Sequence, residues 1–256
     1  MIHNLNGTAR WKDIQQLVRA GDIKKYYSVG DQFIVNYNNT AMLWDIVAID
    51  VATPADTSKT HSLTLMPHNM FYDTRVFDEA EPNNPNFDRR FYGNNRYAHS
   101  AIRQWLNSSA NAGSWWTAQH ECDAAPRYAT TVDGFMKGFD DDFLAVLGLT
   151  KFKVTKNIVT DGGGYEELTD TFYLPSKMEV GLGAENSIEE GTQFPYFTDN
   201  ASRIKYREGT SDIYYWWLRT PHFGGSNFMR YVNMLGTLDD YICFIASGVV
   251  PACNII

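Results

Sequence analysis

Residues 214–256 constrain the fold most, because they carry many large apolar side chains and only the two ends of the segment have a regular period. The aromatic run Tyr214–Pro221 and the closing run Gly248–Ile256 each have the composition of a strand. Between them, residues 224–240 follow neither the period of a strand nor that of a helix. Apolar side chains in such a stretch either fold back into the core or form an exposed binding surface, and the residues alone leave both alternatives open.

The rest of the chain alternates short helix patterns with short strand patterns. Apolar spacing predicts helices over residues 10–20, 97–107 and 140–147. Strand patterns occupy residues 32–37, 42–51 and 63–66, and a hairpin is predicted from 152–160 and 166–174 around the turn 161–164. Loops are predicted over residues 78–95 and 183–212. This mixture of short elements indicates an α+β protein.

The composition is that of a globular protein. The chain has 256 residues, of which 44% are hydrophobic and 20% charged, well outside the range of disordered sequences. We find no global repeat and no linker, so we expect one domain over residues 1–256, with residues 1–30 as a helical lead-in. Aromatic residues reach 14%, and we expect most of them in the core and some exposed for binding.

Charge and cysteine content exclude several classes of function. A net charge of −8 argues against sequence-independent nucleic-acid binding, and no apolar run approaches the roughly 20 residues of a membrane span. The start of the chain lacks the pattern of a signal peptide. The odd number of cysteines, Cys122, Cys243 and Cys253, fits free thiols in a reducing compartment. We therefore expect a protein kept in a cytoplasm, or packed into a particle assembled there.

No motif assembles catalytic or metal-binding chemistry. Asp161–Gly164 lacks the Gly-Lys-Ser/Thr continuation of a phosphate-binding loop. The metal-capable residues His120–Asp123 are consecutive, whereas zinc ligands are spaced so that they converge on one side. The run Asp140–Asp142 fits the start of a helix better than a cation site. We expect no catalytic residue, no metal and no cofactor.

The order and spacing of several short motifs resemble a known family. Its C-terminal pattern reads Trp-Leu-Arg-Ser-Pro, a variable stretch, Val-Asn-x-x-Gly, a second variable stretch and Gly-Val-x-Pro-Ala. This pattern belongs to C-type-lectin-fold proteins of gut bacteria and their phages, many of which are targets of diversity-generating retroelements. The matching residues are 217–221, 230–233, 236 and 248–252. Thr220 and Val250 depart mildly from the usual residues at their positions.

Upstream segments extend the resemblance over nearly the whole chain. They are residues 11–21, 30–33, 60–65, 102–107, 172–176 and 179–180. The resemblance implies a C-type-lectin-like fold, with small antiparallel sheets, flanking helices and long irregular loops. In such a fold, residues 214–256 would form a variable ligand-binding region. The residues Trp217, Leu218, Arg219, Pro221, Gly248 and Pro251 would be scaffold. Arg219 would be at least half-buried and paired with carbonyls or a carboxylate.

The resemblance also implies which side chains bind the ligand. In this family, adenines of a template copy are randomised, typically in Asn codons, which can then encode Asp, Tyr, Ile, Phe or Ser. The two variable stretches of this chain carry such a mixture. The implied ligand-binding residues are His222, Phe223, Gly225, Ser226, Asn227, Phe228, Tyr231, Asn233, Asp239, Asp240, Tyr241, Ile242, Phe244, Ile245 and Ser247.

The implied function is recognition without catalysis. The ligand would be a variable protein or glycan on a cell surface, and the carrier a phage particle. One alternative is an enzyme like the formylglycine-generating enzymes, which share the fold and need paired active-site cysteines; Cys243 and Cys253 are the candidates. The other alternative is a lectin of fixed specificity with calcium, for which Asp239 and Asp240 offer few ligands.

Overall fold

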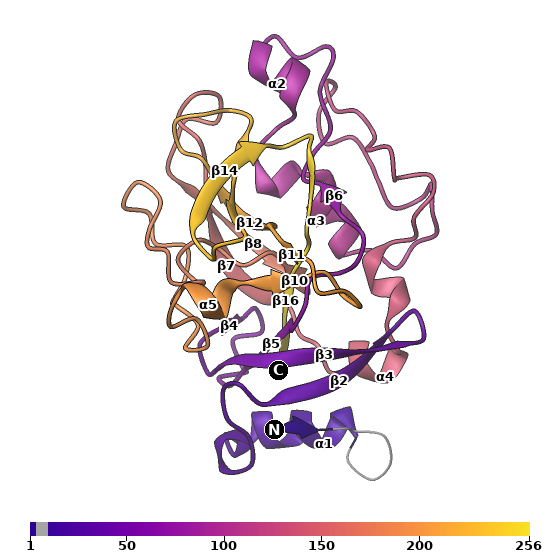
Figure 1. Cartoon of the computed structure of the whole chain (residues 1–256), viewed down its shortest axis with the longest axis vertical. Helices are drawn as coiled ribbons and strands as arrows, with labels where there is room; N and C mark the ends of the chain where they lie inside the picture. Colours follow the sequence, from indigo (N-terminus) through magenta and orange to yellow (C-terminus); the bar gives the residue numbers. More distant parts are fainter. Residues whose placement is uncertain (4–9) are drawn as a thin grey trace.

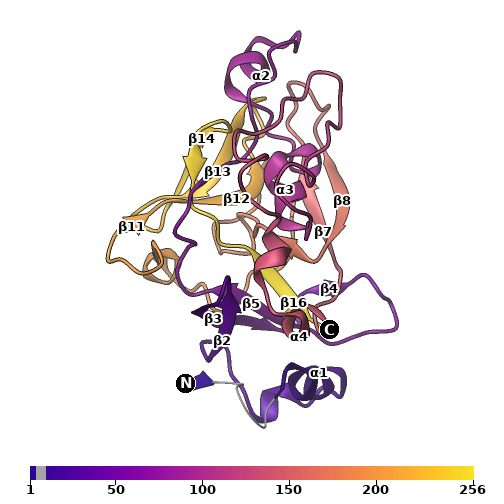
Figure 2. The same ribbon diagram turned by 90° about the vertical axis from the view of Figure 1, so that its right-hand side faces the viewer.

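The computed structural model describes residues 1–3 and 10–256 and has a mixed α+β architecture of small sheets and short helices (Figures 1 and 2). The α+β class predicted from the sequence is therefore confirmed. The largest sheet has six strands, in the order β1-β2-β3-β5-β16-β9. They are β1 (Ile2–His3), β2 (Gln32–Tyr37), β3 (Thr40–Ile49), β5 (Leu63–Pro67), β16 (Ala252–Ile255) and β9 (Phe172–Tyr173).

Four smaller sheets complete the strand structure. Two have three strands, β12-β13-β14 and β4-β7-β8, and two have two strands, β10-β11 and β15-β6. The first is formed by β12 (Trp216–Pro221), β13 (Phe228–Val232) and β14 (Leu238–Ile242). The second is formed by β4 (Thr53–Pro54), β7 (Thr150–Thr155) and β8 (Tyr165–Asp170). The short pairs are β10 (Lys205–Tyr206) with β11 (Ile213–Tyr214), and β15 (Ala246–Ser247) with β6 (Arg75–Val76).

The helices are all short. The α-helices are α1 (Trp11–Arg19), α2 (Phe87–Tyr92), α3 (Ala101–Leu106), α4 (Asp141–Leu144) and α5 (Asn200–Arg203). The 3₁₀ helices are η1 (Ile23–Lys25), η2 (Tyr97–His99) and η3 (Phe135–Gly138). None of these described helices has both the length and the apolar character needed to cross a membrane.

The C-terminal strand, β16, is an inner strand of the largest sheet. β16 lies between β5 and β9 and pairs antiparallel with both, so the end of the chain returns to the first half of the sequence. Figure 1 shows this sheet in the lower half of the molecule, with β14 and α2 towards the opposite end. Residues 222–251 thus form a long connection between two buried strands, β12 and β16.

Aromatic side chains fill the core. Trp44 of β3 lies in edge contact with Phe139, Phe143 and Phe172, at ring-centroid distances of 5.8, 6.0 and 6.4 Å. Buried apolar residues from Trp11 to Ile255 form one continuous cluster. Most of the high aromatic content is therefore used in packing, as the composition predicts.

Several elements lie where local patterns predict them. The predicted helix 10–20 is α1, which buries Trp11, Ile14 and Val18. The predicted strands 32–37 and 42–51 are β2 and β3, joined by a tight turn in which Asn38 and Asn39 have φ values of 49° and 60°. The predicted hairpin around residues 161–164 is β7–β8, but its strands are shorter than predicted, because residues 156–160 are not in a strand and residues 172–173 form β9 of the six-stranded sheet.

Other predictions were wrong in extent. The predicted helix 97–107 is divided into η2 and α3, because Ser100 is extended and its hydroxyl caps Arg103 N. Of the predicted helix 140–147, only the four residues of α4 are helical. The predicted loop 78–95 contains α2, capped by Asn86. The predicted loop 183–212 contains α5 and β10, and the stretch 224–240, which has no sequence period, forms β13 and most of β14.

Candidate ligand-binding surface

The register of β13 and β14 places the candidate side chains on two faces of one hairpin. Phe228 is opposite Ile242 and Arg230 is opposite Asp240, so these four side chains share one face. Tyr231 is opposite Asp239 and Met229 is opposite Tyr241, which gives the other face. The two faces differ in chemistry.

The Phe228 face is built around charged groups. Arg230 donates to both carboxylate oxygens of Glu185 at 3.0 and 2.8 Å, and its guanidinium also lies 3.8 Å from Asp240. His222 Nε2 lies 3.6 Å from the same Asp240 carboxylate. Burial acts to raise the pKa of Glu185, but the hydrogen bonds from Arg230 and Lys177 lower it below its usual value. This face therefore carries a partly buried network of charged groups centred on Arg230 and Glu185.

The opposite face carries a row of tyrosines. Tyr214 and Tyr215 stack at 4.2 Å, Tyr215 lies 5.5 Å from Tyr231, and Tyr231 lies 6.3 Å from Tyr241. Burial and then the charge of Asp239 raise the pKa of Tyr231 to about 12, so its hydroxyl stays neutral at physiological pH. Neutral, half-exposed tyrosines offer both apolar contact area and a hydrogen bond, which suits recognition.

The predicted ligand-binding residues fall into three groups by exposure. Phe228 (37% exposed), Tyr241 (42% exposed) and Asp239 point to solvent. The half-buried residues are His222, Phe223, Gly225, Tyr231, Asn233, Asp240, Ile242, Phe244 and Ile245. Three predicted residues, Ser226, Asn227 and Ser247, are buried. The structure therefore brings most of the predicted residues to one hairpin and its flanking loops.

The three buried residues hold the backbone of the region. The Ser226 hydroxyl donates to Asn86 Oδ1 at 3.0 Å, and the Asn227 carbonyl accepts from Cys243 N at 2.9 Å. The Ser247 hydroxyl donates to the Tyr215 carbonyl at 3.2 Å. These three residues offer a ligand almost no exposed surface and support the backbone of the candidate surface.

A neighbouring loop that the sequence did not assign to the site holds residues 222–247 in place. Asn95 Nδ2 donates to the carbonyls of Gly225 and Phe228 at 2.7 and 3.0 Å, and Phe244 N donates to the Tyr92 carbonyl at 3.2 Å. The same loop carries α2, whose Phe87 and Phe91 are 62% and 49% exposed. The spacing of these two phenylalanines, four residues apart after Asn86, was the sequence signal available for this helix.

Arg219 anchors the scaffold below the surface. It is fully buried and donates to Glu179 at 2.5 and 2.8 Å and to the carbonyls of Lys153, Leu174 and Glu190. The expectation that Arg219 is buried and paired is thus confirmed. All six residues expected to form the scaffold are buried: Trp217, Leu218, Arg219, Pro221, Gly248 and Pro251.

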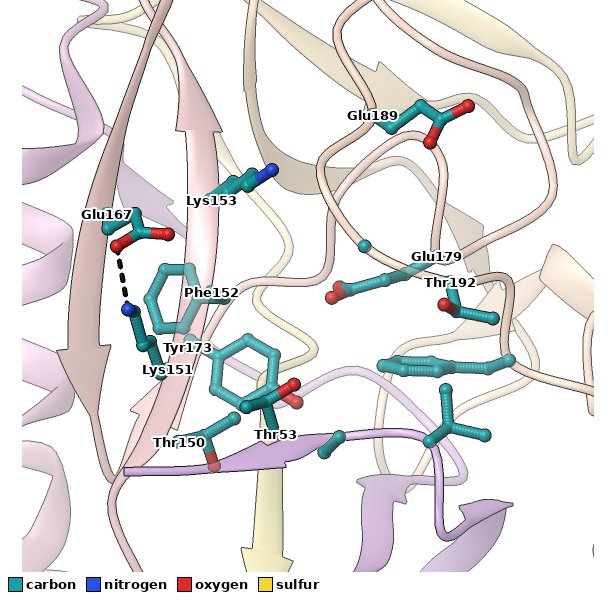
Figure 3. Close-up of a pocket in the computed structure, with 14 residues that line it drawn as sticks. Thr53, Thr150, Lys151, Phe152, Lys153, Glu167, Tyr173, Glu179, Glu189 and Thr192 are labelled. Atoms are coloured by element: carbon teal, nitrogen blue, oxygen red, sulfur yellow. Dashed lines mark ion pairs between the residues drawn. The ribbon is translucent and has the colours of Figure 1, made fainter. Parts of the chain in front are cut away.

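A cavity of about 370 Å³ is lined by no residue of the β13–β14 hairpin (Figure 3). Phe152 and Tyr173 stack in its wall at 4.9 Å, and Glu179 points into it in Figure 3. No predicted ligand-binding residue lines it. The Glu179 carboxylate pairs with Arg219 outside the cavity, and Lys151 pairs with Glu167 at 2.7 Å, while Lys153 and Glu189 also line the cavity.

The cysteines do not form a catalytic pair. All three cysteines are free, and burial raises the pKa of Cys243 and Cys253 well above the usual thiol value. Cys243 follows β14 and Cys253 lies in β16, two strands of different sheets. Among the residues that the structure describes, no group of three or more His, Cys, Asp or Glu side chains is placed to hold a metal ion.

The comparisons with known proteins give a family and no activity. A family described as a domain of unknown function, DUF6273, matches residues 59–256, which is most of the chain. No curated protein and no solved structure matches the chain. The matched segment contains both faces of the β13–β14 hairpin, the Arg219 network and the loop that carries α2.

Proposed function

The chain belongs to the DUF6273 domain family, and we propose that it is a recognition protein that binds its ligand on the β13–β14 hairpin and the adjoining loops. In this proposal the fold is C-type-lectin-like and the variable residues are a target of a diversity-generating retroelement. The ligand is a protein or glycan on a cell surface, and the carrier is a phage particle of the gut community. The function is recognition and not catalysis.

The observation that carries the proposal is the contrast between backbone and side chains in residues 222–247. The backbone is tied down by hydrogen bonds to Asn95 and Tyr92 in a separate loop. The side chains of Phe228, Asp239 and Tyr241 point to solvent and make few of the contacts that hold the segment. A rigid backbone with replaceable exposed side chains lets binding specificity change without loss of the fold.

The topology supports a C-type-lectin-like fold. The last strand returns to an inner position of the six-stranded sheet, between β5 and the edge strand β9, and β12, β13 and β14 form a separate small sheet before it in the chain. Short helices and long loops connect these strands. The arrangement resembles the loop-rich architecture that the sequence motifs imply.

The chemistry of the cysteines favours recognition over the enzyme alternative. A thiol acts as a nucleophile in its thiolate form, and burial disfavours that form. Both candidate thiols, Cys243 and Cys253, are fully buried with raised pKa values. A lectin with calcium would use the Asp239 and Asp240 carboxylates, but Asp240 already faces Arg230 and His222.

Binding to an array of purified bacterial surface proteins and glycans tests the proposal. The test variant carries Phe228→Ser and Tyr241→Ser, which remove one exposed aromatic ring from each face of the hairpin. The control variant carries Tyr26→Ser and Leu149→Ser, which remove exposed apolar side chains of 64% and 53% exposure far from the hairpin in sequence. Thermal unfolding establishes that both variants fold.

We expect the native protein and the control to share at least one interaction that the test variant loses. A buried aromatic contact in a protein interface contributes about 2 kcal/mol or more at its centre, which corresponds to a loss of more than tenfold in affinity. A folded test variant that keeps every interaction of the native protein would contradict the proposal.

A further inference from the structure

Helix α2 has three aromatic side chains, and all three are exposed. Phe87, Phe91 and Tyr92 are 62%, 49% and 36% exposed in a helix of six residues. Phe87 and Phe91 contact each other at a ring-centroid distance of 4.9 Å, and Phe91 lies 6.4 Å from Tyr92. Figures 1 and 2 show α2 at the end of the molecule opposite α1. Neighbouring apolar side chains that remain exposed in a folded protein typically mark an interaction site.

The turn of the β7–β8 hairpin exposes two aliphatic side chains. Ile158 and Val159 are 53% and 51% exposed. A Cβ atom at Gly163 would lie 2.9 Å from Ile158 Cδ1 and 3.5 Å from the ring of Phe223, so the Ile158 and Phe223 side chains approach the same point from two parts of the chain. The Ile158 N–H also donates to the Phe223 carbonyl at 2.9 Å. This turn therefore lies directly beside the loop that joins β12 to β13.

Buried polar contacts hold α2, the β7–β8 turn and the loop after β12 together. Arg89 of α2 donates to the two carboxylate oxygens of Asp161 at 2.9 and 2.8 Å, and its Nε atom donates to the Ser226 carbonyl at 3.3 Å. The side chains of Arg89 and Asp161 are only 10% and 4% exposed. The exposed apolar side chains of both segments thus project from a backbone that is already fixed, which lowers the entropic cost of binding a partner.

The five exposed apolar residues of these two segments form what we call the apolar rim: Phe87, Phe91, Tyr92, Ile158 and Val159. Glycans present hydroxyl groups over most of their surface and pack their C–H groups on flat aromatic faces. Ile158 and Val159 offer neither a flat ring nor a hydrogen-bonding group. The rings of Phe87 and Phe91 are tilted by 54° to each other, so they do not form one flat face. An apolar cleft of a protein is the partner that buries such side chains.

The charges beside the apolar rim do not favour a lipid surface. Anionic membranes attract clusters of Lys and Arg, whereas this chain has a net charge of −8. On α2, Asp88 is exposed, Arg89 is buried in its pair with Asp161, and Arg90 Nε donates to the Asn84 carbonyl at 2.9 Å. The rim therefore has no cluster of free positive charges, and a protein partner is favoured over a membrane.

We propose that the apolar rim is a second contact region of the recognition surface and that it binds an apolar cleft on a folded protein. The inference rests on the proposed function, because it takes the ligand of residues 222–247 to cover the adjoining rim, and it narrows that ligand to a protein. All five rim residues lie outside residues 222–247. The rim contributes affinity that does not depend on the side chains of that segment, and the β13–β14 hairpin contributes specificity.

Binding to two separate arrays tests the inference, one of purified bacterial surface proteins and one of purified glycans. Three double variants of the full chain are compared with the native protein: Phe87→Ser with Phe91→Ser on α2, Ile158→Ser with Val159→Ser on the β7–β8 turn, and Phe228→Ser with Tyr241→Ser on the hairpin. The control is Tyr26→Ser with Leu149→Ser, which removes side chains of 64% and 53% exposure elsewhere in the chain.

We expect the native protein and the control to bind at least one protein of the first array. Each of the two rim variants should weaken that binding about tenfold or more, because a few aromatic and aliphatic anchors carry most of the binding energy of a protein interface. The changed rim residues are at least 49% exposed, and thermal unfolding checks that the variants fold. Since the two rim variants change separate segments, either one alone suffices for the test.

The outcomes separate the rim from the hairpin. If a protein ligand is lost by the hairpin variant and kept by both rim variants, the rim inference is overturned and the proposed function stands. If it is lost by the rim variants alone, the rim is the contact and the proposed function of the hairpin is contradicted. Binding to glycans only, or to no protein of the array, overturns the rim inference.

Two further measurements exclude other occupants of the rim. Vesicles of phosphatidylcholine and phosphatidylglycerol test a lipid surface, and sedimentation of the native protein tests a second copy of the chain. Neither vesicle binding nor self-association should differ between the native protein and the rim variants. A rim-dependent difference in either measurement would identify a lipid surface or a second copy as the occupant and would overturn the inference.

Discussion

Arg219 and Glu179 form a bidentate ion pair in the interior, with Nη1–Oε2 and Nη2–Oε1 distances of 2.5 and 2.8 Å. Arg219 is fully buried and Glu179 nearly so, and each makes further hydrogen bonds to the chain. A buried pair of this kind contributes little net stability against a well-packed apolar substitute, but removal of one partner leaves the other charge buried and unpaired. The pair joins β12 to the segment after β9, below the variable hairpin.

We expect Arg219→Met to lower the free energy of unfolding by about 3–5 kcal/mol, because Glu179 is then left uncompensated. Denaturant unfolding measures the change. Lys151→Met is the matched control, since it breaks an exposed pair with Glu167 and should cost less than about 1 kcal/mol. Adding Glu179→Gln to Arg219→Met should restore part of the loss, because the two residues are coupled. Equal losses for the buried and exposed pairs would contradict this account.

Gly236, in the turn between β13 and β14, is expected to resist any side chain. Its φ is +72°, and a Cβ atom there would lie 1.9 Å from the Asn200 carbonyl oxygen. We expect Gly236→Ala to cost about 3 kcal/mol or more, because left-handed strain and a backbone clash act together. Gly164→Ala isolates the strain, since Gly164 has a φ of +70° and open space around its Cβ position, and it should cost about 1 kcal/mol. Thermal unfolding of the two variants should show this difference, and equal costs would mean that the clash is relieved.

Asp78, beneath the variable segment, is expected to make stability depend on pH. Burial and then the charges of Glu81 and Asp123 raise its pKa well above the usual value, against the hydrogen bond from Ala101 N. A carboxyl whose pKa is raised in the folded state binds protons more tightly there. Its contribution to stability is therefore full below the unfolded pKa of about 3.9 and is lost as the pH rises through the folded pKa.

Asp78→Asn removes this dependence while it keeps an acceptor for Ala101 N. We expect the free energy of unfolding of the variant to rise relative to that of the native protein as the pH rises from about 4 to about 8. The expected gain is about 1.4 kcal/mol for each unit by which the pKa of Asp78 in the folded state exceeds its pKa in the unfolded state. Denaturant unfolding at several pH values measures the gap. If the difference in free energy of unfolding between the two proteins stays constant or narrows with rising pH, the pKa of the Asp78 carboxyl is not raised in the folded state.

Local sequence patterns predicted the helices and strands that are determined by residues close together in the sequence. The β2–β3 hairpin follows from alternating side chains and from Asn38 and Asn39, which tolerate positive φ. Helix α1 follows from the spacing of its three buried residues. In contrast, β14 exposes both Asp239 and Tyr241 on one face and half-buries the other, so it shows no clean alternation of apolar and polar residues. Residues 238–242 form a strand because they pair with β13, and local sequence patterns do not reveal that pairing.

The sequence predicted where the candidate site lies, but not the contacts that hold its backbone in place. The motif resemblance led to residues 222–247, and the structure gathers most of them on one hairpin. The contacts of this segment with Asn95 and Tyr92 join parts of the chain more than a hundred residues apart in sequence, and no periodicity encodes such contacts. The sequence also did not predict the burial of Ser226 and Asn227, because small polar residues are usually exposed.

The last prediction separates positions that can vary from positions that cannot. Asp239→Tyr and Ser226→Tyr introduce the same large side chain into the two predicted variable stretches. Asp239 is exposed on β14, so we expect its substitution to change the free energy of unfolding by less than about 0.5 kcal/mol. Ser226 is fully buried and bonded to Asn86, so the same substitution should cost about 3 kcal/mol or more, because a tyrosine ring overfills the site and breaks that bond.

Denaturant unfolding of both variants, with Tyr165→Asp as an exposed control on β8, measures these costs. The contrast matters for function, because a surface that evolves new specificity can use only the positions whose side chains do not hold the backbone. If Ser226→Tyr proves as stable as Asp239→Tyr, the loop between β12 and β13 must rearrange to admit the ring. The proposed recognition surface would then include position 226 as well, and the hydrogen bonds from Asn95 would no longer fix the backbone of this loop.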